Sequence, residues 1–443
     1  MQLDNSSKEA SPNTSNNKTN KFKKISGGLA AASCALFGTS NVQANSELDA
    51  WKFDTALLIY SEVDRVSAAE GVVSADKSFE DDKKLSLKFV FDTLTGASAN
   101  GAVAQPYVQT FSRPSGKGQF DVKSGVTPLD DTFRDTRVQG NGSWSQPLND
   151  EYDVSVGAHF SKEYDYLSLG VNAGISRDFN QQNTTLSAAF SYSADSIFPE
   201  GGRPLEFGSY AEFTGNPGQQ NIQFNQEKQK GDGSKDTLDL LVGVTQVINK
   251  NTLMQFNYSY SYSDGYHTDP FKMLSILDSQ GYTQSLIYEK RPEERLKHNV
   301  FVRGKYYNSG DILDLSYRYM QDDWKITSHT IDFRYRMPIA GAAIEPHIRW
   351  YQQQAAEFYQ PYMLETQVQP EFASSDYRLG EMEAITVGVK YIDKMDNGNE
   401  YGLRFEYYLQ SNKNAGYEAI GVLNEVEYLP DVSAVIVQFS YSF

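Results

Sequence analysis

The stretch VIVQFSYSF (435–443) alternates apolar and polar side chains up to an aromatic residue. Its apolar members are Val435, Val437, Phe439, Tyr441 and Phe443. Successive side chains of a β-strand point to opposite faces, so the pattern predicts a strand with one apolar face. Such a face is buried either against a protein core or against lipid. The rest of the chain has to decide between these two environments.

The composition is compatible with a membrane barrel. Mean hydropathy is −0.54 although 39% of the residues are hydrophobic, and 29 Tyr and 25 Phe stand against 4 Trp. The sequence contains no run of about 18 apolar residues, which excludes an ordinary membrane-spanning helix. Strands of a membrane barrel average to a polar composition, because apolar outward positions alternate with polar inward positions.

Charge and cysteine content exclude other classes. A net charge of −17 without a Lys/Arg stripe argues against a nucleic-acid partner. Cys34 is the single cysteine, so neither a disulfide framework nor a cysteine metal site is expected, and no cofactor is predicted. The five histidines show no metal-binding spacing, and no Gly-x-Ser-x-Gly elbow occurs. We therefore expect no metal site, no catalytic residues and no enzyme, with an outer-membrane hydrolase as a remote alternative.

The first residues have the anatomy of a secretory signal. Lys21, Lys23 and Lys24 precede the apolar run at 25–38, and small residues at Val42 and Ala44 follow it. This arrangement predicts a signal peptide at 1–44 with cleavage after Ala44, leaving 45–443 as the mature domain. Lipidation at Cys34 is the weaker alternative, because the apolar run continues beyond that cysteine.

From Trp51 onward the dominant period is two. Clear examples lie at 152–160, 167–175, 185–193, 253–262, 314–320, 330–337, 344–351, 384–391 and 401–408. Each is about as long as a tilted strand that crosses a bilayer. Tight connections rich in Asn, Gly and Asp alternate with long polar stretches at 95–131, 196–235, 263–294, 353–376 and 411–430. Short periplasmic turns and long extracellular loops are typical of an outer-membrane β-barrel.

The strand count depends on residues 51–79. If they form two strands that meet near Glu62 to Arg65, the total is 16, and if they form one strand the total is odd. Bacterial single-chain barrels have even numbers of strands, so we expect an all-β, antiparallel, transmembrane barrel of about 16 strands. Counts of 14 and 18 stay open.

Several strings also resemble a known family. They lie at 91–101, 127–138, 264–272, 288–298, 345–359 and 376–391, in a likeness that runs from about Trp51 to the C-terminus. They resemble the bacterial outer-membrane β-barrel family catalogued as domain of unknown function 3570. One departure is Ala99, where the family's loop is expected to carry proline. The resemblance implies a barrel in the bacterial envelope and no particular activity.

The aromatic side chains allow two interpretations. Phe256, Tyr258, Tyr260 and Tyr262 share one strand face. They could form a slide on which sugars stack, or they could be the lipid face with its interfacial girdle. The alternation with polar neighbours favours the lipid face.

The opposite face predicts a charged lumen wall. Alternation places a basic ladder there, made of Arg303, Lys305, Arg318, Arg334, Arg336, Arg349, Lys390 and Arg404. The acids of the same wall are Asp314, Asp332, Glu345 and Glu406. The ladder either selects solutes through a transverse field or belongs to a lattice of ion pairs that only stiffens the wall. The second interpretation is favoured, because Arg and carboxylate side chains pair readily.

A second acidic group, Asp130, Asp131 and Asp135, is expected in a loop. Clustered carboxylates can bind a cation, but acidic outer loops are commonly just solvated, and the spacing is not that of a calcium loop.

The barrel is thus expected to be a passive, porin-like channel for small polar or ionic solutes in the bacterial outer membrane, with the loop at 95–131 as its constriction. The alternative is a plugged binding or scaffold barrel for an envelope partner or an extracellular ligand. Expected partners are outer-membrane lipid, the barrel-assembly machinery and a further copy of the chain in a homo-oligomer. Phe439, Tyr441 and Phe443 resemble the terminal signal that this machinery reads.

Overall fold

The computed structural model describes residues 51–114, 118–210, 228–229 and 231–443, without the side chains of 131–133 and 229. The predicted signal peptide at 1–44 and its cleavage after Ala44 lie outside the described residues. Among the described residues, no helix has the length and apolar character needed to cross a membrane.

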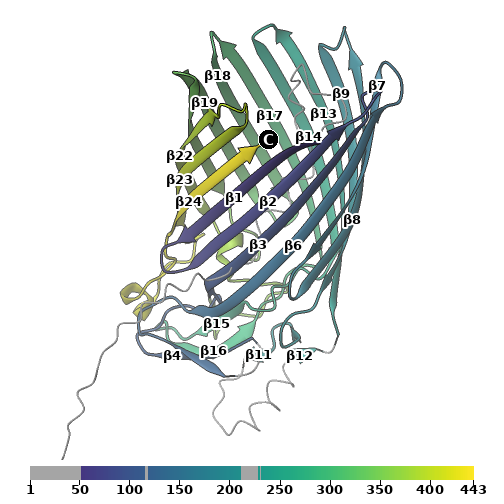
Figure 1. The fold of residues 1–443 in the computed structure, drawn as a ribbon. Helices are drawn as coiled ribbons and strands as arrows, with labels where there is room; N and C mark the ends of the chain where they lie inside the picture. The colour runs from purple at the N-terminus through teal and green to yellow at the C-terminus, as the bar shows by residue number, and fades with distance from the viewer. Residues whose placement is uncertain (1–50, 115–117, 211–227, 230) are drawn as a thin grey trace, which may run out of the picture.

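Sixteen strands form a closed antiparallel barrel (Figure 1). They are β1 (Trp51–Glu62), β2 (Val66–Ser78), β3 (Lys84–Ala99), β6 (Leu129–Pro147), β7 (Tyr152–Lys162), β8 (Tyr166–Phe179), β9 (Thr184–Ile197), β13 (Gly233–Asn249), β14 (Thr252–Gly265), β17 (Glu294–Asn308), β18 (Asp311–Asp322), β19 (Thr327–Ile339), β20 (Ala342–Gln353), β22 (Met382–Lys394), β23 (Glu400–Asn412) and β24 (Val432–Ser442). The predicted transmembrane barrel with 16 strands is confirmed. Residues 51–78 form two strands that meet at 63–65, as the parity argument requires.

The barrel closes where β1 pairs with β24. The register runs from Asp54 opposite Ser442 to Glu62 opposite Ala434. Beyond it, the amide of Phe53 donates to the carbonyl of Phe443 at 2.8 Å, and the two rings stack with centroids 5.3 Å apart. The stretch 435–443 therefore has a partner strand on each side, since β23 pairs with its other edge.

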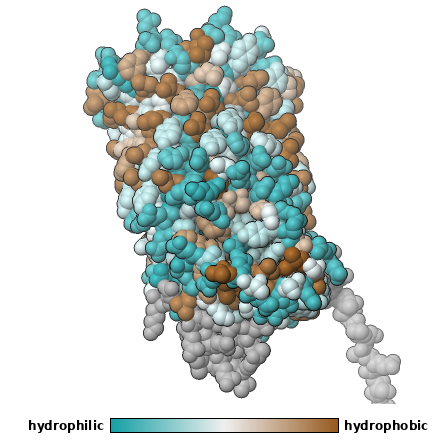
Figure 2. All heavy atoms as spheres, turned by 180° about the vertical axis from the view of Figure 1, so that it is seen from behind, coloured by the Kyte–Doolittle hydropathy of each residue, from teal (hydrophilic) through white to brown (hydrophobic). Residues whose placement is uncertain are grey.

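The outer face of the barrel is apolar. Leu57, Phe89 and Phe405 each expose more than half of their surface. Phe256 is also outward and 47% exposed, so the aromatic row of β14 lies on the lipid side. On the face seen in Figure 2, hydrophobic side chains gather over the end of the barrel away from the loops, and hydrophilic ones dominate toward the loops.

Tight turns at the rim away from the long loops owe their shape to residues that tolerate a left-handed backbone. Asp81 and Asp82 have φ of 59° and 56°, and Asn180 has a φ of 52°. Asp and Asn populate this region more readily than other non-glycine residues, because their short polar side chains bond to the local backbone. These residues therefore allow the tight turns between β2 and β3 and between β8 and β9 to form.

The long loops meet at the opposite rim and form a folded layer, which we call the cap. It comprises the described parts of 100–128, 198–232, 266–293, 354–381 and 413–431. Its centre is the hairpin of β15 (Met273–Leu277) and β16 (Thr283–Tyr288). This hairpin pairs with β11 (Ser209–Tyr210) on one side and with β21 (Met363–Leu364) on the other, in a four-stranded sheet. Figure 1 shows the cap across one end of the barrel.

The cap has a hydrophobic core of its own. Leu274, Leu277, Phe111 and Leu423 come from three different loops, and each is at most 1% exposed. The amide of Val103 donates to Ser275 Oγ at 3.1 Å, and the amide of Val422 donates to the carbonyl of Gln280. The long loops are therefore packed together as one unit.

The loop at 95–131, predicted as the constriction, is part of this cap. Another segment of the cap, the turn η1 (Tyr377–Leu379), lies beside the inner face of a strand end. Gln353 is an inward-facing residue at the end of β20, and its Nε2 donates to the carbonyls of Arg378 and Gly380 at 3.0 and 2.9 Å. These bonds anchor η1 at the mouth of the barrel.

Candidate functional site

The charged lumen wall occupies β17 to β23, where strand alternation places the predicted ladder and its acids on the inner face. Three of the ladder arginines are neutralised by a carboxylate. Arg303 binds Asp314 through Nε and Nη2 at 2.8 and 2.5 Å. The other pairs are Arg334 Nε with Asp332 Oδ1 at 3.1 Å and Arg404 Nε with Glu406 Oε1 at 3.7 Å. In addition, Lys305 Nζ lies 3.6 Å from Asp314 Oδ2. Part of the ladder is thus a lattice of ion pairs.

His347 joins this lattice across several strands. Its Nε2 lies 3.0 Å from Asp332 Oδ2 on β19, and its Nδ1 lies 2.8 Å from Glu406 Oε1 on β23. An ionised carboxylate accepts hydrogen bonds and donates none, so this geometry suits an imidazolium that donates from both nitrogens. The sequence placed His347 on the lumen face, but no local pattern indicated its two partners.

Two ladder arginines differ from the others. Arg318 and Arg349 are exposed, and within the described part of the chain neither makes a hydrogen bond or an ion pair. Arg318 lies over the ring of Phe301, with 5.6 Å between Cζ and the ring centroid. Arg336, Lys390 and Glu345 are half-buried and also lack an ion pair within the described ranges. The wall therefore retains cationic side chains that the lattice does not neutralise.

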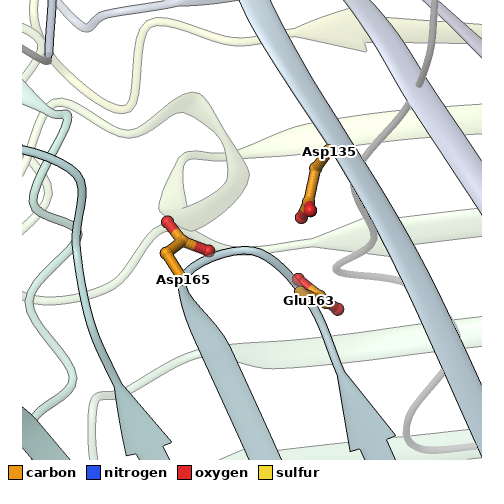
Figure 3. Close-up of side chains that lie close together, drawn as sticks. All are labelled: Asp135, Glu163 and Asp165. Atoms are coloured by element: carbon orange, nitrogen blue, oxygen red, sulfur yellow. The ribbon is translucent and has the colours of Figure 1, made fainter.

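The predicted acidic group at 130–135 takes a different form. Asp130 and Asp135 lie in strand β6 and not in a loop, and the side chain of Asp131 lies outside the described residues. Asp135 instead meets Glu163 and Asp165 of the turn between β7 and β8, with one carboxylate oxygen of each within 4.8 Å of the others (Figure 3). Strand pairing brings these acids together, so their spacing in the sequence did not reveal the cluster.

In this acidic cluster, the pKa values of two carboxyl groups of the turn are raised. Burial, together with hydrogen bonding to Asp135, raises the pKa of Glu163 to about 8. Burial and the charge of Asp135 raise the pKa of Asp165 to about 6. Because like charges disfavour ionisation, Glu163 holds a proton at neutral pH that it shares with Asp135.

A second charged group, the cap latch, links the loop 266–293 to the loop 354–381. It consists of Asp269, Lys272, Glu289, Arg291, Asp376 and Arg378. Arg291 binds Glu289 at 2.6 Å and Asp376 at 2.9 Å. Arg378 binds Asp376 at 2.6 Å and Asp269 at 2.7 Å. Glu289 and Asp376 are at most 1% exposed, so the carboxylates at the centre of the latch are buried inside the cap, whereas Arg378 is exposed.

The latch is electrostatically balanced. Burial alone would raise the pKa of Asp376, but Arg378, Lys272 and Arg291 hold it far below its ordinary value. Burial outweighs the nearby acids at Lys272 and lowers the pKa of its ammonium group. A buried charge without its partner costs several kcal/mol, so each member of the latch depends on the others.

A serine hydroxyl and an imidazole group meet near the rim of the barrel. Ser263 Oγ lies 3.1 Å from His267 Nε2, a pair that sequence reasoning missed. Burial, aided by the charge of Lys235, lowers the pKa of His267 to about 4. The charged groups that act most strongly on this imidazole are therefore cations, whereas a catalytic triad needs a carboxylate to orient the base.

The comparisons with known proteins identify a family. The family model described as protein of unknown function (DUF3570) matches residues 26–443. Among curated proteins none matches significantly.

Solved structures with a similar shape share little sequence with this chain. CdiB from Acinetobacter baumannii aligns with a TM-score of 0.42 and 9% identity, over 88% of this chain and 60% of its own. The siderophore receptor PirA from Acinetobacter baumannii aligns with a TM-score of 0.41 and 9% identity, over 83% and 54%. The corresponding receptor from Pseudomonas aeruginosa gives 0.39 and 9%, over 90% and 63%. The chain thus spans less than two thirds of each of these proteins.

The acidic cluster makes stability depend on pH. The folded chain binds the Glu163 proton more tightly than an unfolded chain does, because the pKa rises from 4.5 to about 8. Its contribution is complete below pH 4.5 and is lost as the pH rises toward 8. We expect the melting temperature in detergent to fall over this interval, and to fall less in Glu163→Gln. Glu80→Gln, in an exposed turn at the other rim, is the control. Equal slopes for all three proteins would contradict this electrostatic account.

Breaking the cap latch is expected to loosen the cap without unfolding the barrel. Asp376→Asn removes the buried carboxylate that Arg291 and Arg378 share and leaves Arg291 with Glu289; the loss of one partner from a buried ion pair costs about 3–5 kcal/mol in comparable sites. Limited proteolysis of the purified protein should then cut within 354–381, while the heat-resistant barrel persists on gels. Glu365→Gln, an exposed acid of the same loop, should stay intact. An Asp376→Asn protein that resists protease as well as the wild type would show that the latch does not hold the cap.

Proposed function

The chain belongs to the protein family DUF3570, and we propose that this member is a passive channel for small polar or ionic solutes in the bacterial outer membrane. The observation that carries the proposal is the lumen wall of a closed barrel with sixteen strands. Barrels with this number of strands are wide enough to hold a water-filled path. Arg318 and Arg349, although inward-facing, are exposed, which supports free space at their level.

The charge of the lumen wall differs around the barrel, and this difference supports an electric field across the lumen. The inner positions of β7, β8 and β9 carry mostly small neutral side chains such as Ser155, Gly170 and Ser191. The ladder and its acids lie on β17 to β23, and a further charged group, Glu70, Asp92 and Arg137, lies on β2, β3 and β6. Because charge on one wall faces small neutral groups elsewhere on the wall, a solute would pass along the charged side.

In this proposal the cap controls the passage of solutes along the lumen. Its loops pack into one buried unit across one end of the barrel, and a solute would have to pass through or around that unit. We propose that the closed cap is the low-conductance state and that movement of the cap opens the channel. Movements of packed loops on microsecond to second timescales would then set the open time.

The second candidate is a binding or scaffold barrel for an envelope partner or an extracellular ligand. The packed core of the cap favours it, because a rigid outer layer can present a fixed surface. In that case the lumen would carry no flux. Catalysis is not part of either proposal, and a hydrolase remains the remote alternative.

Recordings in planar bilayers test the channel. We expect discrete conductance steps from the purified full chain, with larger or longer openings in Asp376→Asn because its cap is loosened. A reversal potential under a potassium chloride gradient should show preference for chloride. Absence of any conductance in both proteins would contradict the channel and favour the scaffold. Activity on lipid or peptide substrates in detergent would instead support the hydrolase alternative.

A further inference from the structure

Arg318 and Arg349 stand apart from the other cations of the wall. Among the inward-facing arginines of β17 to β23 in the described part of the chain, these two are the exposed ones. Arg303 and Arg334, by contrast, are half-buried and held by carboxylates. An exposed side chain on an inward position touches solvent inside the barrel. The two guanidinium groups are therefore accessible from the lumen.

The strand register brings the two arginines into one patch. Arg318 of β18 lies opposite Thr330 of β19, and Arg349 of β20 lies opposite Asp332 of β19. One strand therefore separates them, with an offset of two residues. The patch therefore carries two positive charges on one face of the wall. Two like charges held together in this way favour an anion between them.

The nearest carboxylate by register does not fill this role. Asp332 Oδ1 lies 3.1 Å from Arg334 Nε, and its Oδ2 lies 3.0 Å from His347 Nε2. Within the described residues, neither Arg318 nor Arg349 forms an ion pair with Asp332 or with another carboxylate. The donors of the two guanidinium groups are thus left for a group from outside the chain.

The patch also has directional donors. Arg318 lies over the ring of Phe301, with 5.6 Å between Cζ and the ring centroid, and this cation–π contact helps to position the guanidinium group. Strand alternation places the hydroxyls of Ser316 and Thr330 on the same inner face beside the arginines. Guanidinium forks and hydroxyls are the donors that bind carboxylate and phosphate oxygens.

We propose that Arg318 and Arg349 form a binding site for a small oxyanion, a carboxylate or a phosphate, on the lumen wall. A role of this site in solute passage rests on the proposed channel function. Binding itself does not require flux. The two ideas can therefore fail separately.

Calorimetric titration of the full chain in detergent tests the site. Inorganic phosphate and succinate are the two probes, in separate arms at low ionic strength. We expect the wild type to bind at least one of them. Arg318→Gln and Arg349→Gln should each weaken binding about tenfold or more, because each removes charge-assisted hydrogen bonds, and the double variant should show no binding. Heat from phosphate alone or from succinate alone supports the site and identifies the class of anion.

Lys325→Gln is the matched control, because it removes the same charge from an exposed turn between β18 and β19. It should bind the probes as the wild type does. Circular dichroism shows whether each variant keeps the barrel. Equal binding by the wild type and the double variant, or no binding by the wild type, overturns the site. Arginine-dependent binding without conductance refutes the channel alone, and conductance with arginine-independent binding refutes the site alone.

Discussion

The backbone hydrogen bonds between β1 and β24 are the contact on which the rest of the structure depends. Within lipid every N–H and C=O must find a partner in the chain, and an open sheet edge would leave a whole row of them unpaired. Closure between Asp54 and Ser442 at one end and Glu62 and Ala434 at the other removes that edge. Once the sheet is closed, strict alternation along each strand follows, because one face meets lipid and the other meets the lumen.

Closure of the barrel also determines how much the charged residues contribute to its stability. Exposed ion pairs contribute about 1 kcal/mol or less each, which is small beside the backbone hydrogen bonds of sixteen strands. The pairs of Arg303 with Asp314 and Arg334 with Asp332 are half-buried, so each adds only modestly to these backbone bonds. In the cap latch, Glu289 and Asp376 are fully buried, and the loss of one of their partners leaves a desolvated charge. Stability thus depends on charge most strongly at the buried pairs, among them the latch in the cap and His347 with Glu406 in the lumen wall.

The sequence predicted the features that depend on neighbours along the chain. Alternation gave the strands, Asp and Asn gave the turns at 81–82 and 180–182, and parity gave the two strands of residues 51–78. It could not predict contacts between distant segments. Val103 and Ser275 meet in the cap across 172 positions, and Asp135 meets Glu163 only because β6 pairs with β7. Such contacts follow from register and loop packing, for which a single sequence carries no periodic pattern.

The central claim, that the arginine patch faces water inside the barrel and attracts anions, is tested most directly by thiol accessibility. Cys34 is the only cysteine, so Thr330→Cys in a Cys34→Ser background carries a single reporter opposite Arg318. Small methanethiosulfonate reagents of opposite charge are added to the folded protein, and their rates of modification are compared. Faster reaction with the negative reagent is the predicted result. A cysteine that reacts only after unfolding, or that prefers the positive reagent, would contradict the account.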